Sequence, residues 1–146
     1  MSFFTVDEGH THPNKDLYQI VSNGTVGRNE PLEIHLSTAG YNQNGYFYRD
    51  IYQYAKKIKQ GIIKDETFYQ IMFELDDEDL IDADFWKNKE LWKKANPNLG
   101  ISPTWSGIEK EYRTALESEQ SLIAFKTKHL NVWCDKVTTW INNTIW

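Results

Sequence analysis

The chain has 146 residues, of which 40% are hydrophobic and 25% are charged, as is typical of a folded domain rather than a disordered segment. Its formal net charge of −5 argues against an autonomous nucleic-acid-binding domain, since such domains carry an excess of basic residues. A single cysteine, Cys134, excludes an internal disulfide framework and a cysteine-based zinc site. The sequence has no apolar run of about 18 residues and no signal-peptide pattern, so it predicts a cytoplasmic protein without a membrane span.

The first forty residues predict a strand, a helix and a second strand. Residues 3–6 form a continuous apolar or β-branched run, FFTV, which is typical of a buried parallel strand. Asn14 is a candidate cap for a helix that continues to about residue 22. A second strand is expected over residues 32–39. This order of elements indicates an α/β fold.

The rest of the chain predicts mainly helices. We expect a helix over residues 45–60, a strand over 67–75, and a short helix over 84–95. A capping box at residues 106–109, SGIE, predicts the start of the next helix, and a further one begins near Glu119. The alternating tail from residue 132 predicts a strand or an extended arm. The acidic residues 76–84 are interpreted as a solvated loop, with a partner-binding surface that includes exposed tryptophans as the alternative.

Both predicted strands of the first forty residues end in side chains that could act on a phosphate. An apolar strand followed by Asp7 and Glu8 is typical of a Walker B motif, in which the first carboxylate helps hold Mg²⁺ and the second activates water. Taken alone, the acidic pair is weak evidence for a Walker B motif, because many strands end in acidic residues that are simply solvated. Ser37 and Thr38 could sense a γ-phosphate, or could satisfy local backbone groups. Arg28 could stabilise a transferring phosphoryl group, or could be an ordinary surface arginine.

The pair His10 and His12 forms an H-x-H pattern beside the two acids. With adjacent carboxylates such a pair could bind a metal ion in principle. No third histidine or cysteine stands at a recognisable spacing, so we prefer a turn-stabilising role for the pair.

The order of several segments along nearly the whole chain resembles the large terminase subunit of tailed bacteriophages. These segments are VDEGHTH, NGTVGRNEPLEIHLSTAGYN, YAKKIKQG, FELDDED, FWKNKELWKKANPNLG and KTKHLNVW. That family implies a DNA-packaging motor with an N-terminal ATPase domain and a metal-dependent, RNase H-like nuclease that cuts the DNA concatemer. By this resemblance Asp7 matches the Mg²⁺-associated aspartate and Glu8 the catalytic glutamate. Ser37, Thr38 and Ala39 match the motif that couples hydrolysis to movement, and Arg28 lies in a loop where the family often has arginine.

The sequence departs from the family pattern in one important respect: no G-x-x-x-x-G-K-[ST] phosphate-binding loop occurs in it. The resemblance implies that this loop would lie upstream of Met1, and most nuclease carboxylates downstream of Trp146. The expected fold is therefore α/β, with a partial P-loop-type ATPase sheet from the Walker B strand onward in residues 1–40. A mainly helical linker region leading towards the nuclease is expected in residues 41–146.

Two functions follow from these expectations. The first is a part of the packaging motor that uses ATP and Mg²⁺ only together with a phosphate-binding segment, so that the isolated chain is expected to be inactive and to need no cofactor. The alternative is a non-enzymatic module that binds another terminase fragment, a terminase subunit or the portal. Expected partners are other terminase segments or subunits, the portal and phage DNA, in the host cytoplasm. An unpaired sheet edge predicts either self-association or a rearranged N-terminal segment.

Overall fold

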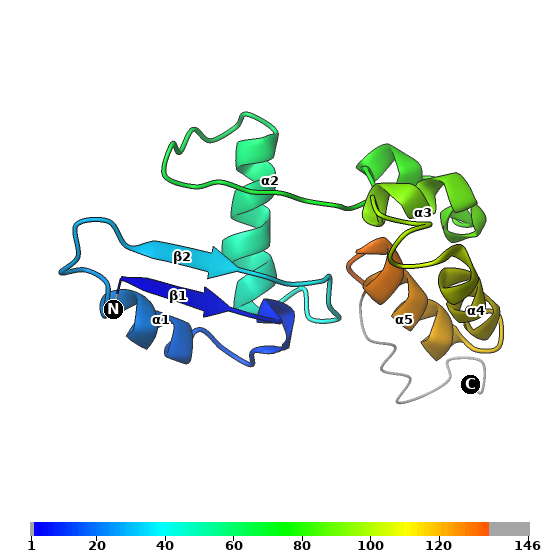
Figure 1. Cartoon of the computed structure of the whole chain (residues 1–146), viewed down its shortest axis with the longest axis horizontal. Coiled ribbons are helices and arrows are strands. Elements are labelled where there is room, and N and C mark those ends of the chain that lie inside the picture. The colour runs from blue at the N-terminus through cyan, green and yellow to red at the C-terminus, as the bar shows by residue number, and fades with distance from the viewer. Residues whose placement is uncertain (1, 135–146) are drawn as a thin grey trace, which may run out of the picture.

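The computed structural model describes residues 2–134, which form two lobes (Figure 1). We call the lobe that contains β1, β2, α1 and α2 the sheet lobe, and the lobe that contains α3, α4 and α5 the helical lobe. Residues 60–76 run from the first lobe to the second, and the chain comes back to the sheet lobe after α5. None of the helices in the described part combines the length and the apolarity that a membrane span requires.

The sheet lobe is built on two parallel strands, β1 (Phe3–Val6) and β2 (Leu32–His35). Phe3 pairs with Leu32 and Val6 with His35, so the strands are in register along their whole length. In the sequence, α1 (Asp16–Asn23) lies between the two strands, as expected for a strand, helix and strand unit. The predicted pairing of two adjacent parallel strands is therefore confirmed, and a mixed α/β fold with it.

The two faces of this sheet differ in burial. On one face Phe4 and Val6 are buried, and Tyr18 of α1 packs against Phe4 with a ring-centroid distance of 6.5 Å. The opposite face has no helix packed on it within residues 2–134. Its apolar side chains are exposed, namely Phe3, Leu32, Ile34 and Leu36. The expectation of a fully buried strand is thus wrong for one face of β1.

The helix expected over residues 45–60 is present in two parts. A π-helical stretch, Phe47–Tyr52, leads directly into α2 (Gln53–Lys59). The helix stops at Gly61, whose φ of +73° is a conformation that glycine adopts without steric cost. Phe47 and Tyr46 are buried against the covered face of the sheet.

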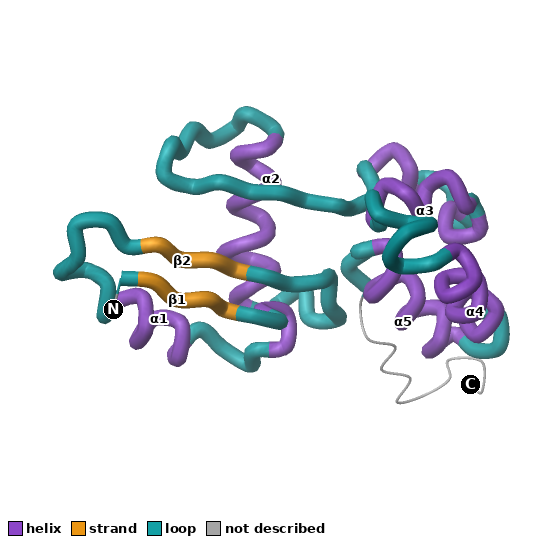
Figure 2. The backbone as a smooth tube through the Cα atoms, viewed as in Figure 1, coloured by secondary structure: helices purple, strands orange, loops and turns teal. Residues whose placement is uncertain are grey.

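The strand expected over residues 67–75 is not formed. This segment is a loop (Figure 2). The sheet in the described part contains β1 and β2 only, so residues 67–75 have no neighbouring strand with which to form backbone hydrogen bonds. Tyr69, Ile71 and Phe73 of this loop are exposed. Aromatic and branched residues alone therefore did not specify a strand here, since strand propensity depends on packing against neighbours.

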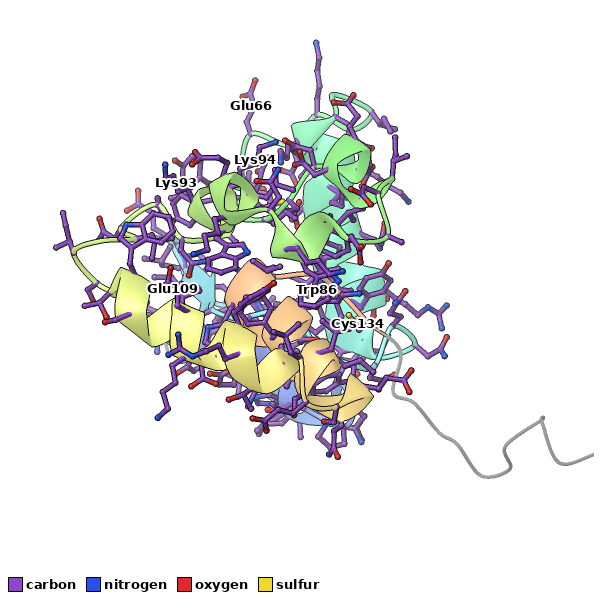
Figure 3. All side chains as sticks on the ribbon, turned by 90° about the vertical axis from the view of Figure 1, so that its right-hand side faces the viewer. Glu66, Trp86, Lys93, Lys94, Glu109 and Cys134 are labelled. Carbon is purple, nitrogen blue, oxygen red and sulfur yellow. The ribbon has the colours of Figure 1, made fainter. Side chains whose placement is uncertain are left out.

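The helical lobe packs α3 (Lys89–Ala95), α4 (Trp105–Ala115) and α5 (Glu119–Leu130) around an aromatic core. Two short 3-10 turns precede α3, at Asp77–Leu80 and Phe85–Lys87. Trp92 and Leu130 are completely buried, and the indole N–H of Trp92 donates to the carbonyl of Trp86 at 2.8 Å. Trp86 is buried as well, so neither of these two tryptophans is exposed for partner binding. Figure 3 views this lobe with Lys93 and Lys94 on α3 and Glu109 on α4.

Helix caps in this lobe differ slightly from those expected. The N-cap of α4 is Thr104, whose hydroxyl accepts from the Gly107 amide, so the helix begins before the predicted box at residues 106–109. The helix expected near Glu119 is confirmed, with Ser118 as its N-cap. Most of the predicted C-terminal strand or arm, residues 135–146, lies outside the described residues.

Candidate functional site

The candidate site lies at the edge of the sheet where both strands end. Because β1 and β2 are parallel, the residues that follow them emerge on the same side. The backbone bonds between the strands continue beyond the ladder: the Leu36 amide donates to the Val6 carbonyl at 2.8 Å, and the Gly9 amide donates to the Leu36 carbonyl at 3.3 Å. The acidic pair after β1 and the small residues after β2 are therefore held close together.

A tight turn follows β1 and carries the acidic pair. Glu8 has a φ of 50° and a ψ of 44°, a left-handed conformation that is uncommon for residues other than glycine. A 3-10 turn, Gly9–Thr11, comes next, and both the amide and the hydroxyl of Thr11 donate to the Glu8 carbonyl. The Glu8 amide donates to Asp7 Oδ1 at 2.9 Å. These bonds pair the polar backbone groups of the turn. The Glu8 carboxylate remains accessible to solvent.

Gly9 is required by the close packing of this turn on the helix that leads into α2. A Cβ atom at this position would lie 2.3 Å from ring carbons of Phe47, far inside van der Waals contact. Gly9 is itself buried. The turn can therefore lie against Phe47 only with glycine at position 9.

His10 links the ends of the two strands. Its amide donates to Ser37 Oγ at 3.0 Å, and its ring Nδ1 lies 3.0 Å from the same oxygen. The Nδ1 atom also lies 3.3 Å from Glu8 Oε2. The ring Nε2 of His12 lies 3.1 Å from the Asp7 carbonyl oxygen. Both rings contact the turn itself, and no group of three or more histidine, cysteine or acidic side chains suited to a metal ion occurs within residues 2–134.

The other residues expected at this site lie just after β2. Thr38 donates through Oγ1 to the Ala39 carbonyl at 3.2 Å, and Ala39 is buried. The Ala39 amide donates to Oδ1 of Asn131, which follows the last residue of α5. A cavity of 340 Å³ separates this edge from α5; it is lined by Glu8, His10, Thr38, Ala39, Tyr41, Thr127 and Lys128.

Asn131, Thr127 and Lys128 were not expected at the site. Asparagine directly after a helical segment is a known signal for a left-handed helix end, so the position of Asn131 as a C-terminal cap was readable in the sequence. Its contact with Ala39 was not, because 92 residues separate the two.

Arg28 is not brought to this edge. It lies in the loop between α1 and β2, at the end of the sheet where the strands begin (Figure 1). Four strand residues, which span roughly 13 Å, separate the two ends. Within one chain the structure thus assembles Asp7, Glu8, Ser37, Thr38 and Ala39, and leaves Arg28 apart.

The residues at this edge fit the expected Mg²⁺ and ATP only in part. Two adjacent exposed carboxylates, Asp7 and Glu8, supply the oxygen ligands that Mg²⁺ prefers. One oxygen of Asp7 already accepts a backbone amide, which leaves the other available. The sequence has no glycine-rich loop with the lysine and hydroxyl residue that hold phosphates in P-loop proteins. The donor set therefore fits the metal, and the phosphates would need groups from another segment.

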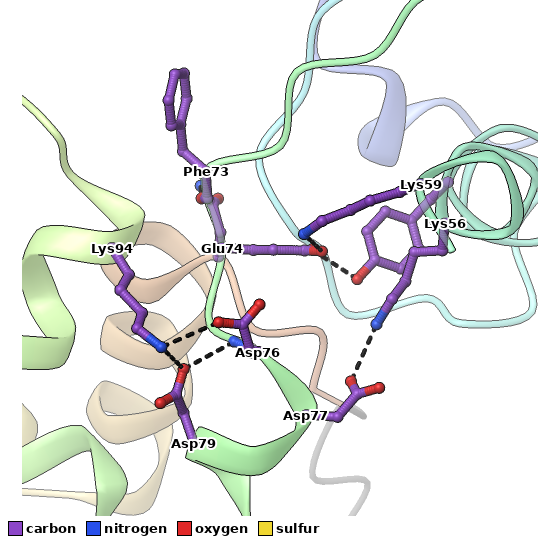
Figure 4. A network of polar contacts seen from close by, with 10 residues as sticks. Lys56, Lys59, Phe73, Glu74, Asp76, Asp77, Asp79 and Lys94 are labelled. Carbon is purple, nitrogen blue, oxygen red and sulfur yellow. Dashed lines mark hydrogen bonds and ion pairs between the residues drawn. The ribbon is translucent and has the colours of Figure 1, made fainter. Parts of the chain in front are cut away.

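A second polar cluster joins the two lobes (Figure 4). Residues 73–79, which we call the strap, run between α2 and α3. Towards the sheet lobe, Lys56 lies 3.0 Å from Asp77, and Glu74 accepts a 2.7 Å bond from the Tyr52 hydroxyl. Burial and then the bond to Glu74 raise the pKa of Tyr52 well above its usual value, so it stays a donor. The Glu74 carboxylate is only 7% exposed. Burial of a charged group is costly unless it is hydrogen-bonded, so the bond from Tyr52 offsets part of that cost.

Towards the helical lobe, one lysine binds two carboxylates of the strap. Lys94 of α3 lies 3.0 Å from Asp76 and 2.6 Å from Asp79. Asp76 and Asp79 also form a reciprocal capping box on the 3-10 turn Asp77–Leu80. Most of the acidic residues 76–84 are exposed, as the interpretation as a solvated loop predicts, but the carboxylates of Asp76 and Asp79 also contact Lys94 and backbone amides of the same chain.

Three comparisons with known proteins identify relatives. Residues 62–146 match the family model described as terminase large subunit, endonuclease domain. Protein YmfN of Escherichia coli K12 is 30% identical over 141 residues, which cover 97% of this chain. The chain spans about 30% of the length of that protein. The crystal structure of the HK97 bacteriophage large terminase matches with a TM-score of 0.70 at 19% identity, over 90% of this chain and 26% of that one.

These matches bear on the expected domain organisation. The structural likeness shows a shared fold for most of the chain. The family model covers residues 62–146 as part of an endonuclease domain, whereas the resemblance in sequence had assigned residues 41–146 to a linker. The division into the end of an ATPase core and a linker is therefore not confirmed by the comparisons.

Proposed function

Because the chain belongs to the terminase large subunit family, we propose that it forms part of a motor that packages phage DNA. In this proposal residues 1–40 are the C-terminal part of an ATPase core, and the following helical region leads into the endonuclease domain. The sheet lobe contributes to ATP-driven DNA translocation, and the neighbouring nuclease domain to cleavage of the concatemer.

The observation that carries the proposal is the common edge of β1 and β2. Ligands of open parallel α/β sheets bind beyond the carboxyl ends of the strands, which is where Glu8 and Ser37 meet through His10. Glu8 would orient and deprotonate the attacking water; its carboxylate is 59% exposed, with Oε2 3.3 Å from His10 Nδ1. Asp7 would hold Mg²⁺ through water molecules. The metal ion, when bound, neutralises charge on the phosphates.

Ser37, Thr38 and Ala39 would respond to the state of the phosphate. Their position supports this role, since Ser37 contacts the turn that carries Glu8 while Ala39 contacts the end of α5. A change at the sheet edge would thus reach the helical lobe through three consecutive residues. The proposed catalytic role of Arg28 stays a prediction, and its place at the far end of the sheet gives it no support within one chain.

A second candidate function is a non-enzymatic interaction module. It is favoured by the open face of the sheet, on which Phe3, Leu32, Ile34 and Leu36 are exposed. Side chains of this kind are normally covered in parallel sheets. The partner would be another terminase segment or subunit, the portal, or a second copy of the chain. Phage DNA would be a partner of the assembled motor.

ATP hydrolysis tests the first proposal. We expect no turnover from the 146-residue chain alone, because its sequence has no phosphate-binding loop. Addition of a separately expressed segment with a G-x-x-x-x-G-K-[ST] loop should restore turnover. Glu8→Gln should then lower the rate by about 10²–10⁴-fold, the usual contribution of a general base.

Glu30→Gln is the matched control, because Glu30 is an exposed glutamate at the opposite end of the sheet. It should leave the restored rate unchanged. Equal loss in both variants, or turnover that persists in Glu8→Gln, would contradict the assignment of Glu8. Stable binding of the added segment without any hydrolysis would support the interaction module instead.

A further inference from the structure

The last turn of α5 is fixed to two distant parts of the chain by one side chain. Asn131 follows α5 with a φ of 52° and a ψ of 37°. Its Oδ1 accepts the amide of Ala39 at 3.3 Å, and its Nδ2 donates to the carbonyl of Phe73 at 2.8 Å. Ala39 belongs to the edge of the sheet, and Phe73 is the first residue of the strap.

Two properties suit asparagine to this position. It tolerates the left-handed conformation better than most residues, so the helix can end here at modest cost. Its side-chain amide also has both a donor and an acceptor, and Asn131 uses one for each neighbour. Aspartate would retain only the acceptor, and glycine would retain only the backbone conformation.

Contacts around Asn131 hold the same segment from other sides. The Cys134 amide donates to the Gly40 carbonyl at 3.3 Å. A Cβ atom on Gly40 would lie 2.9 Å from the Cβ atom of His10 and 3.1 Å from the Trp133 ring. The segment after β2 is therefore enclosed between the turn after β1 and the chain that leaves α5.

The end of α5 that precedes Asn131 also borders the candidate site. Thr127 lies four residues before Asn131, in the last turns of α5, and it is almost completely buried. Thr127 and Lys128 line the cavity together with Glu8 and Thr38. The end of α5 thus forms one wall of the cavity at the sheet edge.

We propose that Asn131 is a positioning residue that holds the segment after β2, through the backbone of Ala39, on the end of α5 and ties both to the strap. Because the bond is made to backbone rather than to a side chain, a displacement of residues 37–39 must displace α5 or break this bond. The use of that link during ATP-driven movement rests on the proposed function. The positioning itself does not, and it is tested without nucleotide.

The test is amide hydrogen exchange, followed by NMR in the 146-residue chain. Asn131→Gly keeps the positive φ and removes both side-chain bonds, so the Ala39 amide should exchange about fivefold faster, as expected for one lost hydrogen bond. Asn131→Asp keeps the acceptor, so Ala39 exchange should stay within about twofold of the unmodified chain. The NMR chemical shift of the Phe73 carbonyl carbon should change in both variants, since neither glycine nor aspartate at position 131 can donate a side-chain hydrogen bond to that carbonyl.

Two references make the outcome decisive. The Leu36 amide donates to the Val6 carbonyl just beyond the strand ladder and not to Asn131, so its exchange should not change. Asn98→Gly removes an exposed asparagine of the helical lobe and should leave Ala39 unaffected. Unchanged Ala39 exchange in Asn131→Gly overturns the proposal, as does equal acceleration at Leu36 and Ala39. Loss of protection in Asn131→Asp equal to that in the glycine variant also overturns it. The exchange experiment uses no ATP. If Glu8 proved to have no catalytic role, these results would therefore still test the positioning by Asn131.

Discussion

The Nδ1 atom of His10 lies 3.0 Å from the hydroxyl oxygen of Ser37, although 27 residues separate them in sequence. The backbone amide of His10 donates to the same oxygen. One serine hydroxyl therefore connects the turn after β1 with the segment after β2. This contact sets the position of the proposed coupling residues relative to Glu8, whose carboxylate reaches the same imidazole.

Removal of that hydroxyl should loosen the edge of the sheet. Ser37→Ala leaves the His10 amide without its acceptor, so we expect the free energy of unfolding to fall by about 1–2 kcal/mol. Ser37→Thr keeps the hydroxyl and should recover most of that loss. Urea denaturation followed by tryptophan fluorescence measures both variants. Equal stability of the alanine variant and the unmodified chain would show that the contact contributes nothing.

Glycine at position 9 should be essential to the packing of the turn. Gly9→Ala places a Cβ atom 2.3 Å from the Phe47 ring, which requires the helix or the turn to move. We expect a loss of about 1–3 kcal/mol in the free energy of unfolding, as is usual for overpacking. Gly27→Ala is the matched control, because nothing lies within 4 Å of its Cβ position. A control variant as unstable as Gly9→Ala would contradict steric crowding as the cause.

The pattern of apolar residues was enough to predict β1, β2 and the main helices. The spacing of Phe47, Ile51, Ala55 and Ile58 specifies a helix because each residue returns to the same face, whatever the partner is. Strand signals are weaker, since residues 67–75 have the right composition but no neighbouring strand in the described part. Whether such a segment becomes a strand depends on contacts that lie far away in sequence.

The candidate site was predictable only where strand ends carry it. Asp7, Glu8 and Ser37 converge because parallel strands end at one edge, and this follows from the order of elements. Arg28 could not be placed in the same way, because a loop before a strand lies at the opposite end. Asn131 escaped prediction because its role depends on α5 packing beside the sheet edge, which no local pattern encodes.

The strap should depend on pH through Asp79. The hydrogen bond from Lys94 is the main cause that holds the pKa of Asp79 below its ordinary value of 3.8. Because the folded-state pKa is lowered, the stabilisation is present above pH 3.8 and is lost as the pH falls through the lower folded value. We therefore expect Lys94→Gln to be less stable than the unmodified chain at pH 7, with a difference that shrinks below pH 3.8.

Lys110→Gln is the control for this experiment, since Lys110 is exposed on α4 and has no ion pair among the described residues. Urea midpoints at pH 7, 5 and 3 measure the effect. Added salt should also reduce the difference at pH 7, because both partners are partly exposed and their attraction is screened. A difference between Lys94→Gln and the unmodified chain that is the same at pH 7 and pH 3 would show that packing of the lysine stem, and not its charge, holds the strap.

The open face of the sheet should make the chain associate with itself. Ile34 lies at the centre of that face, and two strands alone give only a marginal sheet with unpaired edges. Sedimentation equilibrium should show association that grows with concentration. Ile34→Lys places a charge on the contact surface, so it should shift the midpoint of association at least about tenfold upward, equivalent to about 1.4 kcal/mol. Ile101→Lys is the control, because Ile101 is 83% exposed in the helical lobe. A chain that stays monomeric at every concentration while the β1–β2 pairing is intact would show that the apolar face does not drive association.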